Sequence, residues 1–276
     1  MEVITTGTGS PIPSPDRAGP STLVRTPAGA FLVDAGRGVI MRLAAAGVMP
    51  LNLRALLLTH LHSDHITDLN DLITTRWIMT TEPDPLVIYG PEGTQQVVDH
   101  ILAMLSPDIG YRLAHHEDLD WPPPVEVHEI AATPDQNVFD ADGVVITAQP
   151  TDHRPVAPTI GFRVEADGQT VALGGDTIPC EGLEALVRGA DVYVQTVIRD
   201  DFVKMVPNQR LQDILDYHST VLQSGEVAAK GGVGTLVLTH LVPPPPPEQE
   251  DEWRTMAAAA FDGTIVVARD LTEVSC

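Results

Sequence analysis

The segment LLLTHLHSDH, residues 56–65, contains the densest group of metal-binding side chains in the sequence. It begins as a continuous apolar run, which predicts a buried strand over 55–59. A helix is predicted over 66–79, so the polar half of the segment lies between the carboxyl end of a strand and the start of a helix. Loops in this position are where α/β folds usually build their sites.

The polar half of this segment has the residue types and the spacing of metal ligands. In extended backbone, His60 and His62 point to the same side of the chain and can bind one ion. Asp64 and His65 follow where the chain turns into the helix, so they can face a second ion. Imidazole and carboxylate suit zinc, and also manganese or iron, and the pattern contains no thiolate ligand. The segment therefore predicts a site for two divalent metal ions.

Three further strands end in a histidine or an aspartate. VVITAQPTDH ends at His153, TVALGGDT carries Asp176 after two glycines, and GTLVLTH ends at His240. The two glycines allow the backbone at Asp176 to come close to its neighbours. We expect the four strands to deliver their ligands to one rim.

The rest of the chain alternates short apolar runs with helical patterns, which predicts sheets layered with helices on their outer faces. Strands are predicted over residues 2–5, 21–26, 30–34, 55–59, 86–89, 125–131, 143–149, 159–165, 169–174, 191–196, 234–239 and 264–268. Helices are predicted over residues 38–47, 66–79, 92–105, 181–188, 209–216, 219–230 and 250–261. No linker of low complexity divides the chain, so residues 1–276 are predicted to form one domain.

The charge balance restricts the class of partner. The chain has 38 acidic and 16 basic residues and a formal net charge of −22, which disfavours nucleic acid and anionic membranes as partners. Two cysteines, Cys180 and Cys276, are too few for a disulfide framework. The N-terminal sequence has no signal-peptide pattern, and no apolar stretch reaches the ~18 residues of a membrane span. These features predict a cytoplasmic protein without a membrane segment.

The set His60-x-His62-x-Asp64-His65, His153, Asp176 and His240 resembles the metallo-β-lactamase superfamily of metallohydrolases. The segments GTGSP (7–11), FLVDAG (31–36) and HST (218–220) are most similar to its ribonuclease Z and arylsulfatase-like branch. The resemblance covers nearly the whole chain. It implies an α/β fold, namely an αββα sandwich of two mixed β-sheets with helices on the outer faces and the metals at one edge.

The resemblance also implies a role for each ligand. His60, His62 and His153 would hold the first ion. The second ion would be held by Asp64, His65 and His240, and Asp176 would bridge both. A hydroxide shared by the two ions would be the nucleophile, because cations lower the pKa of bound water to about 7.

Three residues are assigned roles beside the metals. Asp64 and His218 are the candidate catalytic residues, and His218 would stabilise the developing oxyanion or protonate the leaving group. Alternatively, His218 is only a solvated histidine at the start of a helix. Asp34 would orient a ligand histidine, or would be only a turn aspartate.

Two departures from the ribonuclease Z pattern favour a small-molecule substrate over RNA. The interval between His153 and Asp176 holds only a hairpin, so the long arm of enzymes that process transfer RNA is missing. The chain also has LTHLVPPPPP where that family usually has LTHFS-x-R-Y. With the negative charge, these features predict a hydrolase of an ester, a lactone, a sulfate or phosphate ester, or an activated aryl ether.

The walls of the substrate site are expected to come from three segments, residues 74–85, 198–209 and 243–247. Trp77 and Met79 in the first, and Phe202 and Met205 in the second, could contact an apolar substrate. For Trp77, however, a core position on the helix over 66–79 is the favoured reading, and for residues 243–247 a stiff connector to the helix over 250–261 is favoured.

Two other functions are kept as alternatives. One is a ribonuclease Z-like phosphodiesterase or nuclease. The other is a non-catalytic metal-binding subunit, which the complete ligand set argues against. Relatives often pair, which leaves a homo- or hetero-oligomer open.

Overall fold

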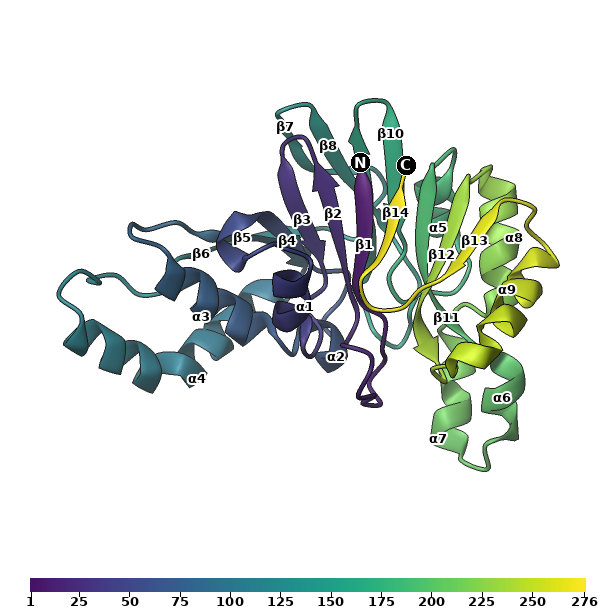
Figure 1. Ribbon diagram of the computed structural model, residues 1–276, viewed down its shortest axis with the longest axis horizontal. Coiled ribbons are helices and arrows are strands. Elements are labelled where there is room, and N and C mark those ends of the chain that lie inside the picture. Colours follow the sequence, from purple (N-terminus) through teal and green to yellow (C-terminus); the bar gives the residue numbers. More distant parts are fainter.

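A computed structural model describes residues 1–276 as two seven-stranded β-sheets packed face to face, with helices on both outer faces (Figure 1). This arrangement confirms the predicted αββα sandwich. In spatial order, the first sheet contains β14 (Thr272–Ser275), β1 (Glu2–Gly7), β2 (Ser21–Thr26), β3 (Gly29–Val33), β4 (Leu53–Leu57), β5 (Leu86–Pro91) and β6 (Val125–Ile130). The second contains β13 (Thr264–Val267), β12 (Thr235–Val242), β11 (Val192–Ile198), β10 (Gln169–Leu173), β9 (Ile160–Ala166), β8 (Val144–Pro150) and β7 (Gln136–Ala141).

Both sheets are mixed, and their strand directions determine which loops meet. In the first sheet β1, β3 and β4 run the same way, because β1 and β3 are both antiparallel to β2 and β4 is parallel to β3. In the second sheet β8, β10 and β12 run the same way, because β9 is antiparallel to both its neighbours and β10 to β12 are parallel. Strands that share a direction end at one edge of their sheet, so the loops after them are brought together.

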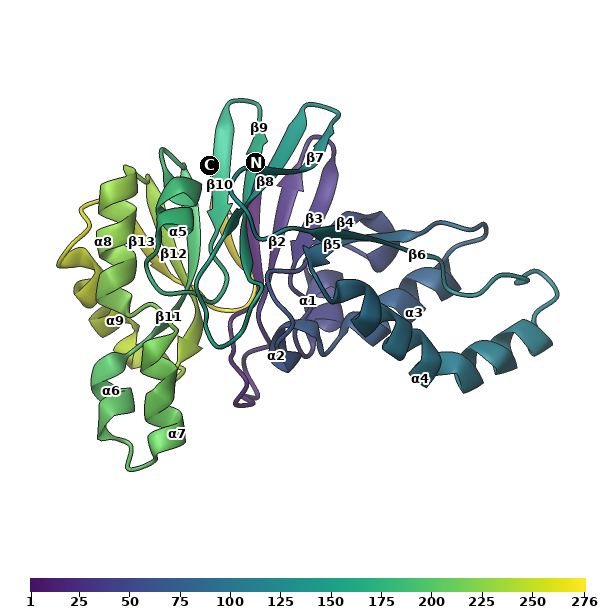
Figure 2. The ribbon, with the colours of Figure 1, turned by 180° about the vertical axis from the view of Figure 1, so that it is seen from behind.

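The helices form the two outer layers. On the first sheet lie α1 (Val39–Ala45), α3 (Leu69–Met79) and α4 (Thr94–His115), and on the second lie α5 (Glu181–Val187), α8 (Val221–Gly231) and α9 (Glu250–Ala258). Three further helices are short: α2 (Ser63–Ile66) follows β4, α6 (Asp200–Met205) follows β11, and α7 (Gln209–Gln212) follows α6. In both views α6 and α7 project beyond the end of the second sheet, and α4 projects to one side (Figure 2).

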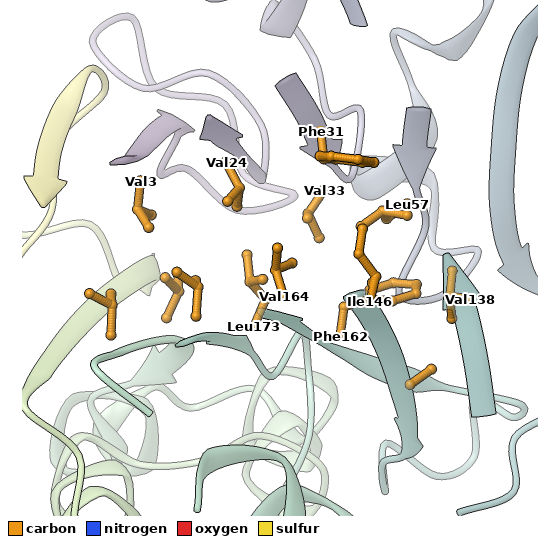
Figure 3. Packing of buried hydrophobic residues seen from close by; sticks show 14 of the residues in the cluster. Val3, Val24, Phe31, Val33, Leu57, Val138, Ile146, Phe162, Val164 and Leu173 are labelled. Carbon is orange, nitrogen blue, oxygen red and sulfur yellow. The ribbon is translucent and has the colours of Figure 1, made fainter. Parts of the chain in front are cut away.

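The core between the sheets forms because successive side chains along a strand point to opposite faces of its sheet. In β3, Phe31 and Val33 point between the sheets, whereas Leu32 between them points to the outer helices. Figure 3 shows Phe31 and Leu57 of the first sheet facing residues such as Phe162 of the second. Burial of each such side chain contributes roughly 1.5–3 kcal/mol, so this layer holds the two sheets together.

The structure differs from the predicted elements in places where the sequence signal is weak. Strands β7 and β14 and helix α6 were not predicted, since QNVFDA and TEVS are short and polar and become strands by pairing with β8 and β1. The helix predicted over 66–79 corresponds to α3, and a separate short helix, α2, ends at Ile66 before it. None of the helices is both long enough and apolar enough to cross a membrane.

Candidate metal centre

The first four candidate ligands lie directly after β4, as predicted. His60 and His65 are fully buried, and Asp64 is nearly so. The apolar residues of β4 pack in both cores, which holds its end in place, and α2 begins at once after His62. The turn into α2 carries Asp64 and His65 to the same edge as His60.

The remaining candidates come from the second sheet. His153 follows β8, Asp176 follows β10, and His240 lies near the end of β12. Gly175 has a φ of +65°, and a Cβ there would lie 2.9 Å from the Cβ of Thr59. A larger residue at this position would push apart the two strand ends that carry the ligands.

One group of donors contains His60, His62, His153 and Asp176. Nε2 of His60 lies 3.1 Å from Nδ1 of His62, which in turn lies 3.3 Å from Nε2 of His153. Two nitrogens bound at about 2.0–2.1 Å to one tetrahedral zinc ion lie roughly 3.3 Å apart. The nitrogens therefore have the separation that one shared cation requires.

The second group contains Asp64, His65 and His240. Nε2 of His240 lies 3.2 Å from Oδ2 of Asp64, and Nε2 of His65 lies 3.7 Å from the same oxygen. Oδ2 of Asp176 lies 3.4 Å from Nε2 of His65 and 3.8 Å from Nε2 of His60. The carboxylate of Asp176 therefore lies between the two groups, where it can bridge two ions.

Buried polar partners orient these ligands. Asp34 accepts a hydrogen bond from Nδ1 of His65 at 2.8 Å and another from the backbone N–H of Thr59 at 2.8 Å. Nδ1 of His153 donates to the carbonyl of Tyr217 at 2.8 Å. Each bond turns the Nε2 atom of its histidine towards the centre. The orienting role predicted for Asp34 is thus supported by its contacts.

The electrostatics of the site suit a cation. Burial holds the pKa of His60 well below 6.5 and lowers the pKa of His153 to about 4, so both are neutral and able to ligate. Burial also acts to lower the pKa of His65, but the carboxylates of Asp176 and Asp34 outweigh it and raise that pKa well above 6.5. Oδ1 of Asp176 is buried without a hydrogen-bond partner. The residues present therefore fit a pair of divalent metal ions.

A pocket of about 330 Å³ opens beside these groups. His218 lines it, as the resemblance implies, with Nδ1 donating to the carbonyl of Ile214 at 3.0 Å and Nε2 lying 3.3 Å from Oδ2 of Asp176. Besides the donor side chains, its other walls are Ser10, Pro11, Ile12, Ser63, Leu211, Ile214, Tyr217 and Val242. The reading of His218 as a solvated histidine is wrong, because the side chain is buried in the site.

The prediction that residues 74–85, 198–209 and 243–247 form the walls is wrong, because none of them lines this pocket. The favoured reading of Trp77 is confirmed, because it is a core residue whose Nε1 donates to the carbonyl of Trp121. The walls come instead from the loop after β1 and from residues 211–217. The segment GTGSP contained the only signal for the first of these, and the second is a helical turn with no motif.

Comparison with known proteins agrees with the fold and the donor set. Residues 30–241 match the family described as the beta-lactamase superfamily domain, so the chain belongs to the metallo-β-lactamase superfamily and is a metal-dependent hydrolase. Over 99% of its length it is 56% identical to ribonuclease Z from Mycobacterium bovis (strain BCG), and it covers 98% of that protein. The family resemblance found in the sequence is confirmed.

Solved structures agree at the level of the fold. Human tRNase Z, short form, superposes with a TM-score of 0.72 at 25% identity, with 100% of this chain and 99% of that one covered. The metallo-β-lactamase fold protein YhfI from Bacillus subtilis gives a TM-score of 0.76 at 21% identity, with 99% and 98% covered.

The expectation of a small-molecule substrate, with nucleic acid disfavoured as a partner, is wrong. The finding that overturns it is the match at 56% identity to a protein named ribonuclease Z. The missing arm does not separate this chain from that enzyme, since the match covers 98% of its length. The net charge of the chain does not exclude RNA, because it sums the whole surface, whereas a substrate contacts only the part of the surface around the site.

Proposed function

We propose that this chain is a ribonuclease of the ribonuclease Z type, a metal-dependent phosphodiesterase that cleaves transfer RNA precursors. The observation that carries the proposal is the match to ribonuclease Z over nearly the full length of both chains. The complete donor set supports it, since hydrolysis of a phosphodiester by two metals needs ligands for both. An RNA substrate also agrees with the predicted cytoplasmic location.

We propose two zinc ions as the cofactors, because the donors are imidazole and carboxylate groups, with manganese or iron as alternatives. His60, His62 and His153 would hold one ion, and Asp64, His65 and His240 the other, with Asp176 between them. When bound, the ions supply Lewis acidity, which lowers the pKa of water and stabilises negative charge on the phosphate.

The chain's own residues would complete the chemistry. The carboxylate of Asp64 lines the pocket and would orient the attacking water. As an imidazolium, His218 would carry a proton at Nε2 that it can give to the leaving oxygen, while its Nδ1–H donates to the carbonyl of Ile214. That hydrogen bond keeps the ring in one orientation as the substrate changes charge.

The test of this function is an activity panel on the purified, metal-loaded protein. The substrates are a transfer RNA precursor with extra nucleotides at its 3′ end, bis-(p-nitrophenyl) phosphate, an aryl sulfate and a lactone. We expect cleavage of the precursor at a single position. Hydrolysis of the sulfate or the lactone without any cleavage of RNA would refute the proposal.

Two variants separate metal binding from proton transfer. Asp176→Ala should abolish cleavage and lower the metal content, because it removes the carboxylate between the two groups. His218→Ala should lower turnover, by roughly 10²–10⁴-fold for a general acid, with both ions retained. Loss of metal from His218→Ala would show that the ligand assignment is wrong.

A further inference from the structure

Almost every cationic side chain of this acidic protein is paired with a carboxylate. Of the 16 lysines and arginines, only Arg37, Arg188 and Arg210 make no ion pair. All three are exposed. Two of them adjoin the walls of the metal pocket: Arg210 precedes Leu211 in the chain, and Nη2 of Arg37 donates to the carbonyl of Pro11 at 3.4 Å.

Arg37 belongs to a surface groove of about 330 Å³ that lies outside the metal pocket. The groove, which we call the arginine groove, is formed by the loop after β1 and by the start of α1. Its lining contains three arginines and no carboxylate, and it consists of Pro13, Ser14, Pro15, Arg17, Ala18, Arg37, Gly38, Met41 and Arg42. Arginine is the side chain best suited to bind a phosphate, and a lining without a carboxylate presents no competing acid within the hollow.

The acids nearest to the groove lie outside its lining. Nε of Arg42 pairs with Oδ2 of Asp270 at 2.9 Å, and Nη2 of Arg17 lies 3.5 Å from Oε1 of Glu250. Asp270 also accepts the backbone N–H groups of Thr8 and Ala18, so it holds the loop after β1 in place. Exposed Asp16 adjoins Arg17 in sequence. Arg37 has no such partner, so its full charge is available to a ligand.

The loop after β1 connects the groove with the metal pocket. Ser10, Pro11 and Ile12 line the pocket, whereas Pro13, Ser14 and Pro15 line the groove. Figure 1 shows this loop projecting from the same end of the molecule as α2 and α7. A polymer that places one phosphodiester at the metal ions therefore reaches the arginine groove within a few nucleotides.

We propose that the arginine groove binds a backbone phosphate of the RNA substrate, with Arg37 as the contacting cation. The proposal rests on the proposed function and adds the site at which this acidic chain holds a polyanion. The metal pocket lacks any lysine or arginine in its lining, so it cannot supply that contact itself. A small phosphodiester would occupy the pocket alone and would not reach the groove.

The test compares Arg37→Ala with Arg188→Ala. Both replace an exposed arginine without an ion pair, but Arg188 lies at the end of α5, where the chain turns back to begin β11 at the opposite edge of the sheet. With a transfer RNA precursor, Arg37→Ala should lower kcat/KM roughly tenfold through loss of a charge-assisted contact. It should also reduce the slope of log(kcat/KM) against log[salt] by about one unit. Arg188→Ala should change neither.

Bis-(p-nitrophenyl) phosphate tests whether the effect is confined to the polymer. Its kcat and KM should be unchanged in Arg37→Ala, because this substrate does not extend to the groove. An equal loss on both substrates, or a wild-type rate and salt slope on the precursor, would overturn the proposal.

A binding measurement distinguishes failure of the arginine groove from failure of the proposed function. Affinity for a fluorescein-labelled precursor is measured by anisotropy in the wild type, Arg37→Glu and Arg188→Glu. Weaker binding of Arg37→Glu alone supports the groove even if the wild type fails to cleave RNA. Equal affinities of the two variants would overturn the groove even if the wild type cleaves the precursor.

Discussion

At the scale of single residues, the geometry of the two donor groups depends on side chains outside them. Asp34 contacts both His65 and the backbone of Thr59, so one carboxylate positions a ligand of the second group and the strand end that carries the first. It also has a φ of +61°, a conformation that aspartate tolerates better than most residues. The sequence offered the aspartate but could not distinguish this role from that of a turn residue, because the difference lies in a contact 31 positions away.

Asp34→Asn should weaken metal binding, since the amide keeps the shape but loses the charge that fixes the orientation of His65. We expect the affinity for one of the two ions to fall roughly 10–100-fold. Titration of the metal-free protein with a chelator as competitor measures it. Asp167→Asn is the matched control, because Asp167 has a similar φ of +52° in an exposed turn. Equal affinities in wild type and Asp34→Asn would refute this role.

At the scale of elements, the capping of α8 fixes the segment that carries His218, the proposed catalytic acid. The side chain of Thr220 accepts the backbone N–H of Gln223, and Gln223 accepts the backbone N–H of Thr220 in return. This pair caps α8 at Thr220, two residues after His218. Ser219 donates to the carbonyl of Thr177, which joins the same segment to the loop that carries Asp176.

Thr220→Ala should lower the free energy of unfolding by about 0.5–2 kcal/mol, because it leaves a helix donor without its partner. Urea denaturation followed by circular dichroism measures the change. Thr255→Ala is the control, since Thr255 is exposed within α9 and alanine favours a helix interior. If the two variants are equally stable, the cap contributes nothing.

The sequence predicted the clustering of the donor side chains better than it predicted the walls of the pocket, and the reason lies in the strands and loops. His60, His153 and Asp176 each follow an apolar strand closely, so the strand pattern alone indicates a common edge. The walls depend on how the loop after β1 and the turn at 211–217 pack around that edge. Such packing leaves no local pattern, just as β14 becomes a strand only by pairing with β1.

At the scale of the whole molecule, the donors join the two sheets. His60, His62, Asp64 and His65 belong to the first sheet, and His153, Asp176 and His240 to the second. The arginine groove lies at the same end, which shows why a total charge of −22 does not describe the surface that a substrate meets.

Removal of the metal ions should therefore destabilise the fold as well as stop turnover. A ligand present at 100 times its dissociation constant stabilises the native state by about 2.7 kcal/mol, which shifts Tm by roughly 5–10 °C in a chain of this size. Thermal unfolding with and without EDTA measures the shift. Asp176→Ala should show a smaller one, and an identical Tm with and without EDTA in the wild type would contradict the expectation.

The division of the donors between the two sheets also has a consequence for the order of events during folding. Either sheet alone holds only part of the donor set, since His153 lies 91 positions from His62 and His240 lies 176 positions from Asp64. Tight uptake of the ions must then await docking of the sheets. If refolding takes place with a coloured, metal-loaded chelator, the rate at which the chelator loses its ions would therefore report when the two sheets dock.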